Sequence, residues 1–186
     1  AVQFAENGRK EYHAVLKLGM VTDTQDTTGT VLSRSERAIS RAELEAVLPQ
    51  FRGDILQVPP MYSALKVNGK KLYELAREGI EIERKARTVH FYEISILEVK
   101  LPLVRMEVTC SKGTYIRTLL EDIAAATGQK GTMSALRRTT AGVYTEADAH
   151  TLEEILAAKE QGPAALEALM LPVESVFTPL PLLVVE

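Results

Sequence analysis

The order of hydrophobic and polar positions divides the chain into short alternating segments and short helical stripes. Residues 11–18 alternate well enough for a half-buried strand, and the polar run 22–29 that follows is typical of a loop. With a second strand at 30–33, this region predicts a hairpin with a long polar loop. Ser40 and Glu43 have the spacing of a capping box, and the apolar stripe after them predicts a helix that ends near Phe51.

The middle of the chain predicts a sheet. Residues 87–100 and 103–110 are rich in β-branched and aromatic side chains and are separated by Pro102, so we expect two strands that pair. Residues 114–127 have helical periodicity, and residues 134–144 then return to the sheet. Short helices are expected at 71–77, 151–158 and 163–169, and a strand at 180–186. The predicted fold class is α+β, with a mixed, mainly antiparallel sheet and flanking helices.

Charge is distributed unevenly along the chain. The net charge is −3 over 186 residues, but residues 145–186 hold eight acids and one base, so the first 144 residues carry +4. Within that part the bases cluster at 66–87 and again at 112–138. Such clusters permit binding to a polyanion, although charge alone favours ordinary solvated surface.

Composition excludes several classes of protein. A hydrophobic content of 46% allows one main domain with its own core, and no run of about 18 apolar residues predicts a membrane span. The first residues lack the layout of a signal peptide, so we expect a cytoplasmic protein. Cys110 cannot form an internal disulfide, and His13, His90 and His150 have no zinc-like spacing. We therefore expect no metal.

One segment combines a strand, a glycine turn and a helix start: Cys110-Ser111-Lys112-Gly113-Thr114-Tyr115-Ile116-Arg117. Taken alone, this pattern favours a plain structural turn over an anion site. Its residues, however, are one of a series of ordered motifs that runs from about Lys10 to Val176. The others are Lys10-Glu11-Tyr12-His13-Ala14, Leu18-Gly19, Thr22-Asp23-Thr24-x-Asp26-x-x-Gly29, Phe51-Arg52-Gly53, Gln57-x-Pro59-Pro60-Met61-Tyr62-Ser63-Ala64-Leu65-Lys66, Gly69-Lys70-Lys71-Leu72-Tyr73 and Leu136-Arg137-Arg138.

With these motifs the sequence resembles the bacterial tRNA pseudouridine-55 synthases. The resemblance implies isomerisation of one uridine in the TΨC loop of tRNA, without cofactor or metal, by an enzyme that is usually a monomer. In that family the catalytic aspartate sits in a Gly-x-Leu-Asp-Pro segment before the Lys-x-Tyr motif, and this sequence contains no such segment. We therefore expect the chain as given to be inactive, and we assign the catalytic role to neither Asp23 nor Asp26.

The resemblance also implies roles for two residues of the chemistry. Tyr12 falls on the family's active-site tyrosine, whose ring stacks on the flipped base and whose hydroxyl takes part in proton transfer at carbon 5. Arg137 aligns with the arginine that pairs with the catalytic carboxylate, which must stay ionised in a water-poor pocket. We expect Arg137 to point into the cleft near Tyr12, and Arg138, its neighbour on a strand, to point to the opposite face.

An RNA-binding surface follows from the same resemblance. Residues 62–79 match part of an insertion that reaches into the TΨC loop, and the residues expected to contact RNA are Lys66, Lys70, Lys71, Lys112, Gly113, Tyr115 and Arg117. Asn68-Gly69 is a hairpin-turn dipeptide within that insertion. We expect a partial catalytic domain at 1–172 and the start of a truncated C-terminal RNA-binding domain at 173–186.

Two other functions fit parts of the sequence. A chain with an RNA-binding surface but no catalytic aspartate could bind or remodel tRNA without modifying it. Ser63-x-x-Lys66 also matches the Ser-x-x-Lys of penicillin-recognising acyl enzymes. That class needs the serine at the start of a helix, whereas Pro59-Pro60 precede it and Asn68-Gly69 follow it here.

Overall fold

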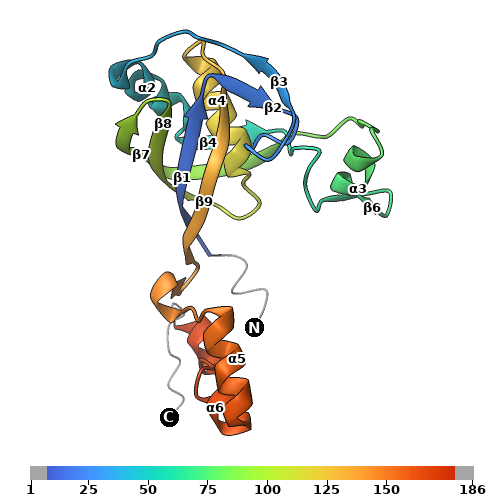
Figure 1. Cartoon of the computed structure of the whole chain (residues 1–186), viewed down its shortest axis with the longest axis vertical. Helices are drawn as coiled ribbons and strands as arrows, with labels where there is room; N and C mark the ends of the chain where they lie inside the picture. Colours follow the sequence, from blue (N-terminus) through green and yellow to red (C-terminus); the bar gives the residue numbers. More distant parts are fainter. Residues whose placement is uncertain (1–7, 179–186) are drawn as a thin grey trace, which may run out of the picture.

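A six-stranded antiparallel sheet forms the body of the protein in this computed structural model, which describes residues 8–178 (Figure 1). In sheet order the strands are β10 (Tyr144–Thr145), β9 (Gly131–Ala141), β1 (Lys10–Leu18), β8 (Leu103–Cys110), β7 (Arg87–Lys100) and β4 (Gly53–Gln57). Within the described residues the only parallel pairing is an isolated bridge between Asp26 and Met133. The predicted α+β class and mainly antiparallel sheet are confirmed.

One face of the sheet carries the hydrophobic core. Ala14, Leu16 and Leu18 alternate along β1 and are buried, as are the core-facing residues of β7 and β8. Helix α4 (Ile116–Ala126) packs on this face against β9 and β1. A Cβ atom on Gly131 would lie 2.5 Å from the Ala124 Cβ, so glycine is what lets the helix approach the sheet this closely.

The strands β7 and β8 have the bounds that the sequence predicts, and they pair. The predicted hairpin between residues 11–18 and residues 30–33 is wrong, because the second strand pairs with a different segment. Gly19, with φ of 95°, ends β1, and the chain then forms β2 (Met20–Thr22), which pairs with β3 (Val31–Arg34) in a separate two-stranded sheet. Strand β1 is left to pair with β8 and β9, which are distant in sequence.

The predicted capping box opens helix α2 (Arg41–Val47). The Ser40 Oγ accepts from the Glu43 backbone N–H at 3.2 Å, and the Ser40 N–H donates to the Glu43 carboxylate at 2.8 Å. The helix continues as the short 3-10 helix η1 (Leu48–Phe51), as expected.

The insertion stands off one side of the sheet in Figure 1. It consists of β5 (Lys66–Val67), β6 (Lys70–Lys71) and α3 (Leu72–Arg77). Asn68 and Gly69 have φ of 51° and 84°, the left-handed values required by a tight hairpin turn, so the predicted turn is confirmed.

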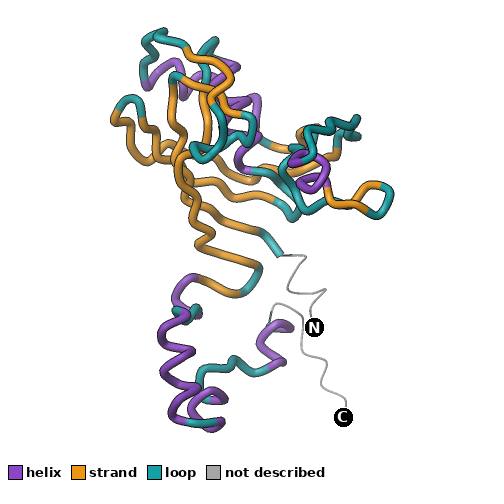
Figure 2. The backbone as a smooth tube through the Cα atoms, turned by 45° about the vertical axis from the view of Figure 1, so that its right-hand side comes forward, coloured by secondary structure: helices purple, strands orange, loops and turns teal. Residues whose placement is uncertain are grey.

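The C-terminal helices lie beyond the end of β9 in Figure 2. They are η2 (Glu146–Asp148), α5 (Leu152–Gln161), α6 (Pro163–Glu167) and η3 (Val173–Phe177), and Thr151 caps α5 as predicted. A hydrogen bond of 2.9 Å between the Tyr144 and Ser175 hydroxyls ties η3 to β10. The strand expected at 180–186 lies outside the described residues. No helix within 8–178 is long and apolar enough to cross a membrane.

Candidate functional site

The polar loop between β2 and β3 is held in one conformation by its own side chains. Asp23 accepts from the Thr30 backbone N–H, and Asp26 accepts from the Thr28 backbone N–H, each at 2.8 Å. The loop is also joined to the sheet, because the Thr27 N–H donates to the Met133 carbonyl at 2.9 Å. These bonds fix the direction in which the loop presents its carbonyl and carboxylate oxygens.

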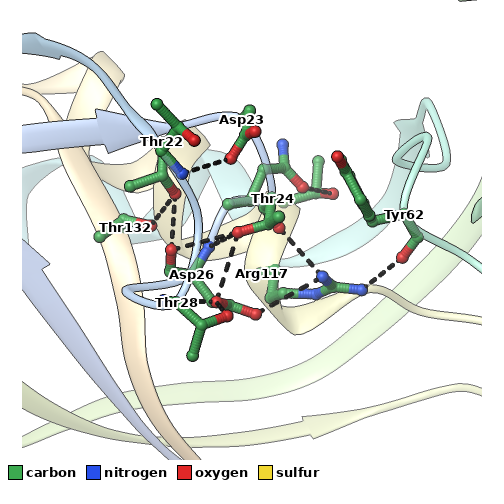
Figure 3. Close-up of polar contacts among 11 residues, drawn as sticks. Thr22, Asp23, Thr24, Asp26, Thr28, Tyr62, Arg117 and Thr132 are labelled. Carbon is green, nitrogen blue, oxygen red and sulfur yellow. Dashed lines mark hydrogen bonds and ion pairs between the residues drawn. The ribbon is translucent and has the colours of Figure 1, made fainter. Parts of the chain in front are cut away.

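Arg117 joins this loop to the insertion and to the start of α4 (Figure 3). One guanidinium nitrogen donates to the Thr24 carbonyl at 2.9 Å and another to the Tyr62 carbonyl at 2.7 Å. The Asp26 carboxylate lies 3.7 Å away, and the Arg117 side chain is only 22% exposed. Three segments that are distant in sequence therefore meet at a single fixed cation.

The carboxyl group of Asp26 is kept ionised by its surroundings. Burial acts to raise its pKa, but the hydrogen bonds from Thr28, the charge of Arg117 and a hydrogen bond from Thr24 outweigh that effect and hold the pKa below its ordinary value. A charged pair of Asp26 and Arg117 is thus the resting state of the site at neutral pH.

Gln57 is a residue of this region whose function the sequence did not indicate. Its buried amide, at the end of β4, accepts from the Tyr115 N–H at 2.8 Å and donates to the Tyr115 carbonyl at 3.1 Å. Tyr115 is the residue before α4, so Gln57 fixes the point where the helix begins. The only signal in the sequence was its place in the Gln57-x-Pro59-Pro60 motif.

Tyr12 lies on the core face of β1, at the end of the sheet where α4 begins. It is half-buried against the core and lies opposite Val108 in the β1–β8 register, two residues along β8 from Cys110. Burial raises the pKa of Tyr12, the nearby Cys110 adds to this, and a hydrogen bond with Arg138 opposes it without cancelling it. The phenol therefore keeps its proton throughout the neutral pH range.

The orientation expected for Arg137 is wrong. In the β1–β9 register Arg137 lies opposite His13 and Arg138 lies opposite Tyr12, so Arg138 shares the face of Tyr12. The Arg137 side chain is 68% exposed and its guanidinium donates twice to the Glu146 carboxylate. Two register shifts, between Glu11 and Tyr12 and between Val15 and Leu16, break the simple alternation of β1 and β9. Without the second shift Arg137 would lie opposite Tyr12.

The basic residues of the insertion are presented along its hairpin. Lys66 and Lys70 are exposed, and Lys70 lies 4.0 Å from Glu78. Lys71 is half-buried and its ammonium donates to the Tyr73 hydroxyl at 3.2 Å. Lys112 is exposed in the turn before α4, where Gly113 has φ of 77°. Among the residues expected to bind RNA, Arg117 has its guanidinium held by two backbone carbonyls, those of Thr24 and Tyr62.

Two further groupings bear on the chemistry. On the opposite face of the sheet, potential ligand atoms of Glu11, His13 and Glu107 all lie within 4.8 Å of one another, a group that has the donor types for a metal ion. Ser63 lies in an irregular loop and its buried hydroxyl has no partner, while Lys66 is exposed on β5. Since Ser63 does not begin a helix, the acyl-enzyme interpretation is not supported.

Two family models match consecutive parts of the chain. The model described as TruB family pseudouridylate synthase (N terminal domain) matches residues 1–116, and that of the tRNA pseudouridylate synthase B C-terminal domain matches residues 117–178. The chain belongs to the TruB family. The junction of the two family models falls at Arg117.

Relatives in the TruB family are longer than this chain. It is 47% identical over 182 residues to the tRNA pseudouridine synthase B of Stutzerimonas stutzeri, covering 97% of this chain and 60% of the relative. The corresponding protein of Hydrogenovibrio crunogenus is 51% identical over 166 residues, covering 89% of this chain and 54% of the relative.

Among solved structures, the chain resembles the crystal structure of a Cbf5-Nop10-Gar1 complex. The TM-score is 0.69 at 26% identity, over 94% of this chain and 45% of that one. The fold is also similar to that in an H/ACA RNP bound to a substrate RNA containing 2'-deoxyuridine, with a TM-score of 0.65 at 23% identity over 94% of this chain and 43% of that one.

Proposed function

We propose that the full-length protein converts uridine to pseudouridine at position 55 in the TΨC loop of tRNA. The observation that carries the proposal is Arg117, a guanidinium held at the start of α4 in a chain that belongs to the TruB family. This chain supplies the tyrosine, the fixed arginine and the basic insertion. The protein acts as a cytoplasmic monomer and needs no cofactor.

Arg117, and not Arg137, pairs with the catalytic carboxylate in this proposal. The Thr24 and Tyr62 carbonyls position its guanidinium but do not neutralise it, and Asp26 at 3.7 Å compensates its charge only in part. A fixed cation of this kind keeps a neighbouring carboxylate ionised and stabilises negative charge that develops during reaction. The two hydrogen bonds and Asp26 prevent it from swinging away when the pocket is empty.

Tyr12 provides the platform for the extruded base. Flipping a base exposes its π-face at a cost of a few kcal/mol, and stacking on an aromatic ring returns about 1–3 kcal/mol. Its hydroxyl takes part in the proton transfer at carbon 5, where the hydrogen leaves as the new bond forms. Because the pKa of the phenol is raised, the oxygen accepts that proton as its own proton passes to another acceptor.

The grip on tRNA comes from the insertion and the turn before α4. Lys66, Lys70, Lys71 and Lys112 contact phosphates, while Gly113 and Tyr115 let the backbone of the turn approach the RNA. Within this proposal, residues 62–79 are the tRNA-contacting part of a partial catalytic domain that extends to 172. Residues 173–186 begin the C-terminal RNA-binding domain.

Tritium release tests this function. The full-length protein, given a tRNA transcript labelled with tritium at carbon 5 of its uridines, should release one equivalent per tRNA, because that hydrogen leaves when the new bond forms. A transcript with cytidine at position 55 is the matched control and should release none. Binding without release would favour the non-catalytic tRNA-binding function, and undiminished release from the control would contradict position 55.

A further inference from the structure

The face of the sheet opposite the core carries a group of three potential metal ligands. Glu11 and His13 are two residues apart on β1, so their side chains point to the same face, away from the buried Ala14. The β1–β8 register runs without a shift and places Glu107 directly opposite His13. Strand pairing therefore brings two carboxylates and one imidazole together.

The distances within this group suit a single metal ion. The ligand atoms of the three side chains all lie within 4.8 Å of one another. The His13 Nε2 atom is 3.2 Å from a Glu107 carboxylate oxygen. Two ligands bound to Zn²⁺ at about 2.0–2.1 Å in tetrahedral geometry are about 3.3 Å apart, so this pair already has the required separation. The Glu11 side chain has three torsions, and rotation about them brings its carboxylate toward the same point.

Neighbouring bases leave the charge of the group uncompensated. Among residues 8–178, neither Glu11 nor Glu107 forms an ion pair with a lysine or arginine. Arg137 lies opposite His13 on β9, but its guanidinium is paired with Glu146. Two carboxylates held this close repel each other, and a divalent cation between them replaces that repulsion with attraction.

The group is accessible to an ion and is partly held in place. The exposed fraction of the side chain is 42% for His13 and 35% for Glu107, so ions from solution reach the ligand atoms. The Thr139 hydroxyl on β9 donates to the Glu11 carboxylate at 2.8 Å. A hydrogen bond of this kind orients a ligating carboxylate and strengthens metal binding.

The other two histidines provide a comparison. His90 lies 2.7 Å from Asp54, and His150 lies 3.7 Å from Glu154. Each has a single carboxylate beside it, and within residues 8–178 no second group of three such ligands occurs. Histidine spacing along the sequence could not indicate the group at His13, because one of its ligands comes from β8.

We propose that Glu11, His13 and Glu107 bind a zinc ion that links β1 to β8 on the outer face of the sheet. One imidazole and two carboxylates are ligand types that Zn²⁺ accepts, with water completing the coordination. Mg²⁺ and Ca²⁺ prefer oxygen ligands, so the imidazole selects against them. The ion lies on the face opposite Tyr12, where it stabilises the sheet and takes no part in the chemistry at uridine. The site is therefore independent of the proposed function.

Cobalt substitution tests the site in the full-length protein. Co²⁺ bound in place of Zn²⁺ absorbs visible light more strongly than aqueous Co²⁺, so titration of the metal-free protein should give a saturable signal. Zn²⁺ should displace the cobalt, and a large excess of Mg²⁺ should not. A free Zn²⁺ concentration about 100-fold above its dissociation constant should raise the Tm by about 4 °C.

Variants decide whether the named residues hold the ion. His13→Ala should abolish the cobalt signal, and Glu107→Gln, which keeps the size of the side chain, should weaken binding at least about tenfold. Thr139→Val should weaken it about 10–100-fold, because the contact that orients Glu11 is lost. His90→Ala removes a histidine with one carboxylate and is the matched control, in which the signal should be unchanged.

Circular dichroism establishes that each variant is folded before the metal is added. No saturable cobalt signal, unaltered affinity in folded Glu107→Gln, or loss of the signal in His90→Ala would overturn the proposal. A Tm that does not respond to Zn²⁺ would overturn the stabilising role of the ion.

Discussion

Substitutions of Tyr12 should separate its two proposed roles, base stacking by the ring and proton transfer by the hydroxyl. In the full-length protein we expect Tyr12→Phe to keep its affinity for tRNA while pseudouridine formation slows sharply, because the ring remains and the protonated hydroxyl is removed. Tyr12→Ala should also weaken binding. Filter binding and single-turnover tritium release measure the two effects. An undiminished single-turnover rate in Tyr12→Phe would remove the hydroxyl from the mechanism.

Arg117 and Arg137 should differ in their effect on the rate because their surroundings differ. Arg117→Ala should lower the rate of pseudouridine formation by about 10²–10³-fold, the usual effect of deleting one preorganised donor. Arg117→Lys should restore little, since an ammonium cannot reach two carbonyls and a carboxylate at once. Arg137→Ala removes only an exposed pair with Glu146 and should leave the rate unchanged. A severe loss in Arg137→Ala and a mild one in Arg117→Ala would return the role to Arg137.

At the scale of elements, the β5–β6 hairpin should act as an electrostatic grip. Changing Lys66, Lys70 and Lys71 to Ala together should weaken tRNA binding and reduce its salt slope by about 0.7–0.9 for each phosphate that the hairpin no longer neutralises. Turnover at saturating tRNA should change less. Lys159→Ala, at an exposed position on α5, is the control. Unaltered affinity and salt slope in the triple variant would mean that the hairpin does not bind the RNA.

The link between β4 and α4 depends on Gln57. Gln57→Ala leaves the N–H of Tyr115 without its partner, while the Tyr115 carbonyl keeps its bond from the Leu119 N–H, so the free energy of unfolding should fall by about 1–3 kcal/mol. Gln50→Ala, at an exposed position in η1, should change it by less than about 0.5 kcal/mol. Urea denaturation compares the two variants. Equal midpoints would show that Tyr115 finds other partners, and that α4 does not depend on this amide.

At the scale of the whole molecule, the 186-residue chain by itself should bind a TΨC stem-loop weakly and form no pseudouridine. The reason is that it contains no Gly-x-Leu-Asp-Pro segment to supply the carboxylate that the family uses. Tritium release by the purified chain, free of host enzyme, is the measurement. Release of tritium would mean that a carboxylate within the chain is catalytic. Asp26 lies beside Arg117, so Asp26→Asn would be the first variant to test.

The sequence by itself determined what local rules control. The capping boxes at Ser40 and Thr151 fixed helix starts, Asn68-Gly69 fixed a turn, and β-branched and aromatic content fixed the long strands β7 and β8, because each depends on residues a few positions apart. The ordered motifs also sufficed for the family, which the family models confirm.

Only the tertiary structure decided which residues meet. The register shift between Val15 and Leu16 put Arg138, not Arg137, opposite Tyr12, and the faces of a strand cannot be read from alternation once a bulge intervenes. The turn at Gly19 sent β1 to distant partners, because strand pairing depends on interactions across the whole fold. Arg117 is held in position by the carbonyls of Thr24 and Tyr62, which lie 93 and 55 residues away in the sequence. No local sequence pattern predicts such an interaction.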